Sequence, residues 1–111
     1  MNKIYNLSNR VALITGAGGF LGLFHAKALL ENGATVIITD RNISKLNKNF
    51  FSLKNDFKNN QIYKAKIDVT SEKDLFNFLK IIKKKFKKLD ILINNAAIDS
   101  KVNTKGNLKK K

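Results

Sequence analysis

The sequence predicts an α/β fold: a doubly wound parallel sheet with the spatial strand order 3-2-1-4 that stops after the fourth strand. Two observations predict it. Short apolar segments typical of buried strands occur at residues 11–15, 34–40, 62–67 and 91–93. The stretches between them carry apolar residues three and four positions apart, which is the period of a helix that faces a core. Strands that alternate with helices form parallel sheets through right-handed crossovers, with helices on both faces.

The first apolar segment ends in a glycine-rich turn and continues as a helix. Strand 11–15 is followed by Gly16, Gly18, Gly19 and Gly22, and the helix is predicted from about residue 20 to 32 with Gly33 as its stop signal. The face of this helix toward the core is predicted from its large side chains: Phe20, Leu21, Phe24, Ala28 and Leu29.

Two further helices complete the predicted pattern. The first, after strand 34–40, carries the apolar stripe Ile43, Leu46, Phe50, Leu53 and Phe57. Ser71, with Asp74 three residues later, resembles a capping box and predicts a helix start there. The apolar stripe of this last helix is Leu75, Leu79, Ile82 and Phe86, and the lysines at 83–85 and 87–88 are interpreted mainly as its solvated face.

The glycine turn predicts an anion site. Glycine allows close backbone approach, and the N-terminus of the following helix offers unpaired N–H groups and the positive end of its dipole. Asp40 ends the second predicted strand, about twenty residues on, where dinucleotide-binding units place a ribose-binding carboxylate. The alternative is that the glycines merely permit a tight strand-to-helix turn. Because the carboxyl ends of parallel strands meet at one edge, we expect Gly16–Gly22, Asp40, Asp68 and Asn94 to converge there.

Composition narrows the class of protein. Residues 1–99 are predicted to form one domain and residues 100–111 a Lys/Asn-rich tail. No cysteine, secretory signal or membrane-length apolar run is present, so we expect a cytoplasmic protein without membrane association. The net charge of +14 comes almost entirely from scattered lysines, with arginine only at positions 10 and 41. Nucleic acid is therefore not the expected partner, although a basic nucleic-acid binder remains an alternative.

Three motifs, in order, resemble the short-chain dehydrogenase/reductase (SDR) family over residues 8–99. Thr15–Gly22 resembles its cofactor turn, Asp68-Val69 its Asp-Val pair, and Asn94-Asn95-Ala96-Ala97 its N-N-A-G motif with alanine in place of glycine. The resemblance implies a Rossmann fold that binds NAD(P). The implied cofactor-binding residues are Gly16, Gly18, Gly19, Phe20, Leu21, Gly22, Asp40, Arg41, Asp68, Val69, Asn94 and Ala96.

The choice of cofactor depends on two adjacent residues. Asp40 favours NAD, because its carboxylate would repel the 2′-phosphate of NADP and accept hydrogen bonds from free ribose hydroxyls. Arg41 supports the alternative, since a basic side chain at this position can hold that phosphate.

The catalytic half of the family pattern does not occur in these residues. The resemblance implies hydride transfer between nicotinamide and a small alcohol or carbonyl substrate, carried by a tyrosine, a lysine four residues later and a serine. Tyr5 and Tyr63 are the tyrosines here, and Asn9 and Ile67 follow them at that spacing, so no catalytic residue and no metal ligand is assigned. We interpret the chain as a cofactor-binding fragment of a homo-oligomeric oxidoreductase. The alternative is a non-catalytic dinucleotide-binding module or pseudoenzyme.

Overall fold

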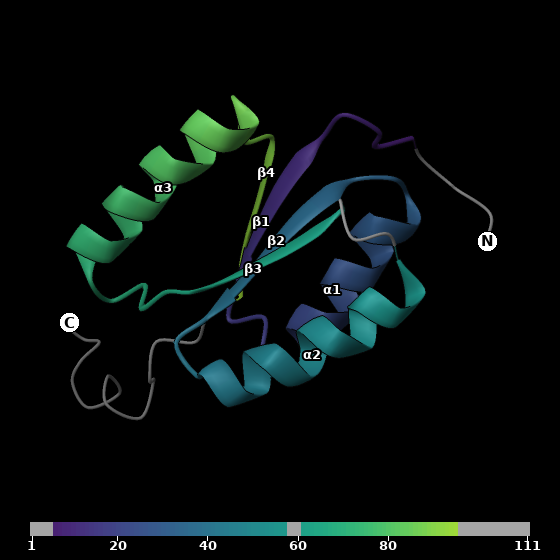
Figure 1. The fold of residues 1–111 in the computed structure, drawn as a ribbon, viewed down its shortest axis with the longest axis horizontal. Helices are drawn as coiled ribbons and strands as arrows, with labels where there is room; N and C mark the ends of the chain where they lie inside the picture. Colours follow the sequence, from purple (N-terminus) through teal and green to yellow (C-terminus); the bar gives the residue numbers. More distant parts are fainter. Residues whose placement is uncertain (1–5, 58–60, 96–111) are drawn as a thin grey trace, which may run out of the picture.

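The computed structural model describes residues 6–57 and 61–95, and it shows a four-stranded parallel sheet in the order β3-β2-β1-β4 (Figure 1). The predicted fold class and strand order are therefore confirmed. The elements in chain order are β1 (Val11–Thr15), α1 (Phe20–Glu31), β2 (Thr35–Asp40), α2 (Ile43–Asp56), β3 (Ile62–Lys66), α3 (Glu72–Phe86) and β4 (Ile91–Asn94).

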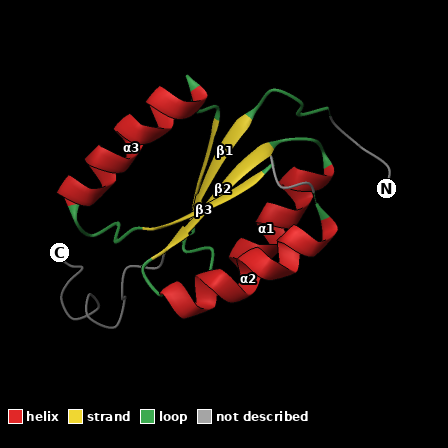
Figure 2. Cartoon of the chain, viewed as in Figure 1, coloured by secondary structure: helices red, strands yellow, loops and turns green. Residues whose placement is uncertain are grey.

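The helices form two layers around the sheet. α1 and α2 cover one face, and α3 covers the other (Figure 2). Each face has its own core: Ile14, Ile38 and Leu46 belong to the first, and Leu13 and Ile37 to the second. Consecutive residues of β1 and β2 thus point into opposite cores, which explains why these central strands carry continuous apolar runs, over residues 11–14 and 36–38.

The predicted core face of α1 is mostly wrong, although Leu29 packs against the core as predicted. The buried residues are Gly22, Ala26 and Leu30, whereas Phe20 is 81% exposed and Phe24 61% exposed. Small residues allow the backbone of this helix to approach the glycine turn closely, and large side chains at those positions would hold it away. Apolar residues surround almost the whole circumference of α1, so periodicity alone could not select its buried face.

The apolar stripes of the other helices are partly confirmed. In α2, Leu46 and Leu53 are buried as predicted, but Ile43 is exposed. In α3, Ile82 is buried as predicted. Phe78, which the predicted stripe omitted, is also buried. The predicted start of α3 at Ser71 and the predicted end of α1 before Gly33 are confirmed. The Ser71 hydroxyl accepts a hydrogen bond from the Asp74 N–H, and Gly33 has a φ of 97°.

A carboxylate ties β1 to its neighbour β4 at the amino ends of these two strands. Asp90, just before β4, accepts a 2.8 Å hydrogen bond from the Val11 N–H at the start of β1. Its neighbours Lys88 and Arg10 approach within 3.3 and 3.8 Å. The Val11 N–H bond, followed by these cations, holds the pKa of Asp90 below its usual value.

β3 and β4 are the outer strands of this sheet, and β4 exposes an apolar side chain: Leu92 is 60% exposed. The predicted domain boundary at residue 99 and the tail lie outside the described residues. No helix in residues 6–57 and 61–95 is long and apolar enough to cross a membrane.

Candidate functional site

The glycine turn between β1 and α1 is a place where side chains cannot fit. Gly16 has a φ of 64°, a left-handed conformation that strains other residues. A Cβ on Gly18 would lie 2.8 Å from the Asp40 Oδ2 atom and from the Lys45 Cβ, and one on Gly22 would lie 2.5 Å from the Ala17 Cα. Gly19 differs, because the nearest atom to its added Cβ is 3.9 Å away. Three of the four glycines are therefore required by the shape of the turn.

Asp40, at the carboxyl end of β2, contacts this turn directly. Its Oδ2 atom accepts a 2.8 Å hydrogen bond from the Gly18 N–H, and its Oδ1 atom accepts one of the same length from the Asn42 N–H. The Ala17 N–H also donates to the Thr39 carbonyl at 2.8 Å. The carboxylate that the sequence suggested for a ribose thus also fixes the backbone beside it.

The N-terminus of α1 points its N–H groups toward the same edge. Gly19 is the N-cap and offers no side chain to cap the helix, so the first-turn N–H groups lack that partner. The side chains of Phe20 and Leu21 are 81% and 58% exposed, so these residues would contribute to a site through their backbone. An anion at this point would be stabilised by the N–H groups and the helix dipole.

The loop after β3 brings a second carboxylate to the edge. Asp68 accepts hydrogen bonds from the hydroxyl and the N–H of Thr70, at 2.6 and 3.0 Å. These bonds, with a smaller electrostatic contribution from Arg41, hold the pKa of Asp68 below its usual value. Arg41 therefore lies within electrostatic reach of the β3 loop, and Val69 packs against the core on the α3 side.

β4 reaches the edge beside β1. Thr15 and Asn94 are paired in the strand register, and the Thr15 hydroxyl donates a 2.8 Å hydrogen bond to the Asn94 Oδ1 atom. Ala96 lies outside the described residues. The remaining predicted site residues thus follow the carboxyl ends of four neighbouring parallel strands, with direct contacts joining β1 to β2 and β1 to β4.

Two residues near the turn were missed by the sequence interpretation. Asn49, buried on α2, donates from its Nδ2 atom to the carbonyls of Ala17 and Gly19. Lys45 places its Cβ beside Gly18. The one signal for Asn49 is its position between Leu46 and Leu53 on the apolar side of the helix.

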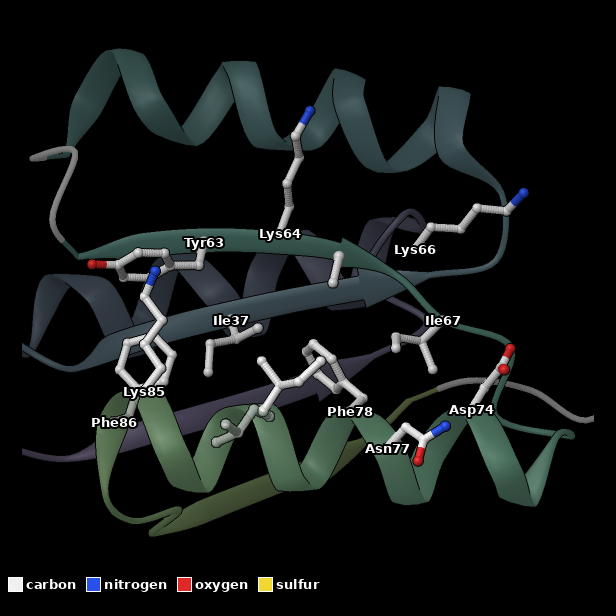
Figure 3. Close-up of a pocket in the computed structure, with 13 residues that line it drawn as sticks. Ile37, Tyr63, Lys64, Lys66, Ile67, Asp74, Asn77, Phe78, Lys85 and Phe86 are labelled. Atoms are coloured by element: carbon white, nitrogen blue, oxygen red, sulfur yellow. The ribbon is translucent and has the colours of Figure 1, made fainter.

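This edge combines N–H donors for an anion with carboxylates that can accept hydroxyl hydrogen bonds. No group of three or more His, Cys, Asp or Glu side chains in the described ranges could hold a metal ion. A separate hollow of about 510 Å³ lies between β3 and α3 (Figure 3). It is lined mainly by core side chains such as Ile37 and Phe78, with Lys85 over the Tyr63 ring at 4.8 Å, and contains none of the predicted site residues.

Known proteins match most of this chain. Galactitol 2-dehydrogenase of Agrobacterium fabrum is 38% identical over 92 residues, which are 83% of this chain and 34% of that protein. The 15-hydroxyprostaglandin dehydrogenase (NAD+) of Mus musculus is 33% identical over 88% of this chain and 36% of its own length. The chain thus spans about a third of the length of these curated relatives.

Solved structures also match most of this chain. NAD+-bound xylitol dehydrogenase superimposes with a TM-score of 0.75 at 34% identity, covering 86% of this chain and 35% of that one. The N-domain of a bacterial malonyl-CoA reductase with NADP reaches 0.78 at 26% identity, over 85% of this chain and 18% of that one. The model of the short chain dehydrogenase family matches residues 10–111. The chain belongs to the short chain dehydrogenases, a family of oxidoreductases.

Proposed function

We propose that this chain binds a nicotinamide adenine dinucleotide across the carboxyl edge of its sheet, as the cofactor-binding part of an oxidoreductase. The observation that carries the proposal is the contact of Asp40 with the glycine turn. It places a hydroxyl-accepting carboxylate immediately beside the uncapped N-terminus of α1. A dinucleotide presents these two chemistries, ribose hydroxyls and a pyrophosphate, next to each other.

Each predicted residue has a role in this proposal. Gly16, Gly18, Gly19 and Gly22 let the backbone approach the pyrophosphate, and the N–H groups at Phe20 and Leu21 bind it. Asp40 accepts the ribose hydroxyls. The adenine lies against the loop of Asp68 and Val69, and Asn94 at the end of β4 continues the site toward the nicotinamide; Ala96 is assigned to the cofactor by the family resemblance alone. When bound, the dinucleotide would supply or accept a hydride for an alcohol or carbonyl substrate.

We propose NAD as the preferred cofactor. Asp40 would repel a 2′-phosphate, and the Gly18 and Asn42 N–H groups hold its carboxylate in place. Arg41 follows it in the chain, and its positive charge would reduce that repulsion, which leaves a weaker affinity for NADP. Structural relatives include both an NAD+-bound xylitol dehydrogenase and a reductase domain with NADP, so both cofactors occur on this fold.

The 111 residues alone are proposed to bind cofactor without turning over substrate, since they contain no tyrosine followed four residues later by lysine. A phenol has a pKa of about 10 and needs a nearby cation to act near neutral pH. The same observation favours a second candidate, a dinucleotide-binding module without catalysis. We also propose that the intact oxidoreductase is a homo-oligomer acting on a small-molecule substrate.

The direct test is a titration of the purified chain with NADH and NADPH, followed by cofactor fluorescence and by ¹H–¹⁵N correlation spectra. We expect saturable binding, tighter for NADH, with the largest shifts at Gly18, Gly19 and the residues after Asp40 and Asp68. No binding at millimolar cofactor, or shifts confined to the hollow between β3 and α3, would contradict the proposal. DNA affinity that falls steeply with salt and resists NADH would favour a nucleic-acid binder.

A further inference from the structure

Asn49 is a polar residue in an apolar environment. It lies in the middle of α2, only 8% exposed, on the same buried side as Leu46 and Leu53. Burial of an amide is unfavourable unless its hydrogen bonds are satisfied. The side chain must therefore gain its partners from the structure packed against α2.

Those partners belong to the glycine turn. The Asn49 Nδ2 atom donates to the Ala17 carbonyl at 2.8 Å and to the Gly19 carbonyl at 3.2 Å. The Gly19 carbonyl also accepts the first hydrogen bond of α1, from the Leu23 N–H at 3.1 Å. One amide group thus holds the turn at two points, from a position 32 and 30 residues away in the sequence.

The planarity of the peptide bond transmits this restraint to the opposite side of the turn. In a trans peptide the carbonyl and the following N–H point in opposite directions. With the Ala17 carbonyl held by Asn49, the Gly18 N–H is directed to Asp40, which accepts it at 2.8 Å. With the Gly19 carbonyl held in the same way, the Phe20 N–H is directed away from Asn49 at the start of α1.

We propose that Asn49 is a positioning residue that orients these two peptides, the first toward Asp40 and the second toward a pyrophosphate, and so sets the affinity of the chain for phosphate-bearing ligands. The inference rests on the proposed function. Asn49 itself would not touch the cofactor, because it acts through the carbonyl side of the turn while the ligand binds the N–H side.

The test compares Asn49→Leu, which keeps the branched shape and removes the donor, with Asn55→Leu at an exposed position of the same helix. NADH, ADP and adenosine are titrated into each protein and followed by ¹H–¹⁵N spectra. We expect Asn49→Leu to weaken NADH and ADP by roughly tenfold, about the effect of one lost hydrogen bond. The affinity for adenosine, which has no phosphate, should change by less than about threefold. Asn55→Leu should resemble the original chain.

The outcomes separate the inference from the proposed function. If the original chain does not bind NADH, the proposed function fails and the inference fails with it. If it binds NADH and Asn49→Leu binds equally well, or loses adenosine to the same extent, the positioning role alone is overturned. Should the variant not fold, hydrogen exchange of the Asn49 side-chain amide is measured in the original chain. NADH and ADP should slow this exchange and adenosine should not, and equal effects of all three ligands would overturn the inference.

Discussion

The Asp40 carboxylate accepts a hydrogen bond from the Gly18 N–H at 2.8 Å, which joins the end of β2 to the turn that follows β1. The proposed ribose and phosphate positions therefore share one restraint. A ligand that binds at both would meet a carboxylate and a backbone already fixed relative to each other.

Replacing Asp40 with asparagine should change both the strength and the selectivity of binding. Asp40→Asn keeps the shape but removes the negative charge that accepts two backbone N–H groups. We expect NADH affinity to fall roughly tenfold, because hydrogen bonds to charged groups are worth about 1.5–3 kcal/mol. The affinity for NADPH should fall less, because its 2′-phosphate no longer meets a carboxylate. Fluorescence titration measures both, and Asp56→Asn, at the exposed end of α2, is the control. An unchanged NADPH/NADH ratio would argue against the ribose assignment.

A side chain added at Gly22 should lower the free energy of unfolding, whereas one added at Gly19 should leave it nearly unchanged. A Cβ at Gly22 would lie 2.5 Å from the Ala17 Cα and 2.9 Å from the Gly16 carbonyl oxygen. Gly22→Ala should lower the free energy of unfolding by about 1–3 kcal/mol, the usual cost of overpacking. Gly19→Ser places its Cβ in ordinary contact, 3.9 Å from the Gly16 carbonyl oxygen, and introduces a good N-cap, so we expect a change within about 0.5 kcal/mol. Urea unfolding followed by circular dichroism measures both variants, and equal losses would contradict the geometry of the turn.

Asp90 should make the stability of the chain depend on pH in the acidic range. Its pKa is lower in the folded chain than its ordinary value of 3.8, so its ionised form stabilises the fold. This contribution is complete above the unfolded pKa and is lost as the pH falls toward the folded one. Asp90→Asn should therefore lower the melting temperature near neutral pH, and the difference from the original chain should shrink below about pH 3. Asp56→Asn is again the comparison, and a difference that stays constant with pH would disagree with this role.

The exposed edge at β4 should make the isolated 111-residue chain associate. Leu92 is 60% exposed on an outer strand, where unpaired backbone groups and an apolar side chain favour pairing with another copy. We expect the sedimentation coefficient to rise with concentration and Leu92→Lys to suppress that rise. Phe76→Lys removes a comparably exposed side chain, 62%, from α3 and should not. A cooperatively melting monomer at all concentrations would refute the expectation.

The central strands were predictable from the sequence because burial on both faces leaves β1 and β2 apolar except for threonines and the terminal Asp40. The buried face of α1 was not, because it is set by how closely Gly22 must approach Ala17, and large apolar side chains on the other faces mask that requirement. The sequence also predicted that Asp40 and the glycine turn reach one edge of the sheet, since their spacing follows from the strand–turn–helix geometry.

The role of Asn49 could not be identified from the sequence, although its position between Leu46 and Leu53 places it on the apolar side of α2. α2 carries several asparagines, and the sequence does not distinguish an amide that supports a turn from one that faces water. Its partners, Ala17 and Gly19, lie 32 and 30 residues away, and only the packing of α2 brings them within reach. The bond between Asp40 and Gly18 is similar, because spacing indicates that both residues reach one edge but not that they touch.

The position of β1 in the middle of the sheet has a consequence for synthesis on the ribosome. β1 is made first, yet its neighbour β4 is made last among the described strands, and the Val11–Asp90 bond joins residues 79 positions apart. The nascent polypeptide can pair β1 with β2 early, but the other side of β1 stays without β4 until translation has passed residue 94. Cofactor added during translation should therefore begin to protect the emerging chain from proteolysis only after that point.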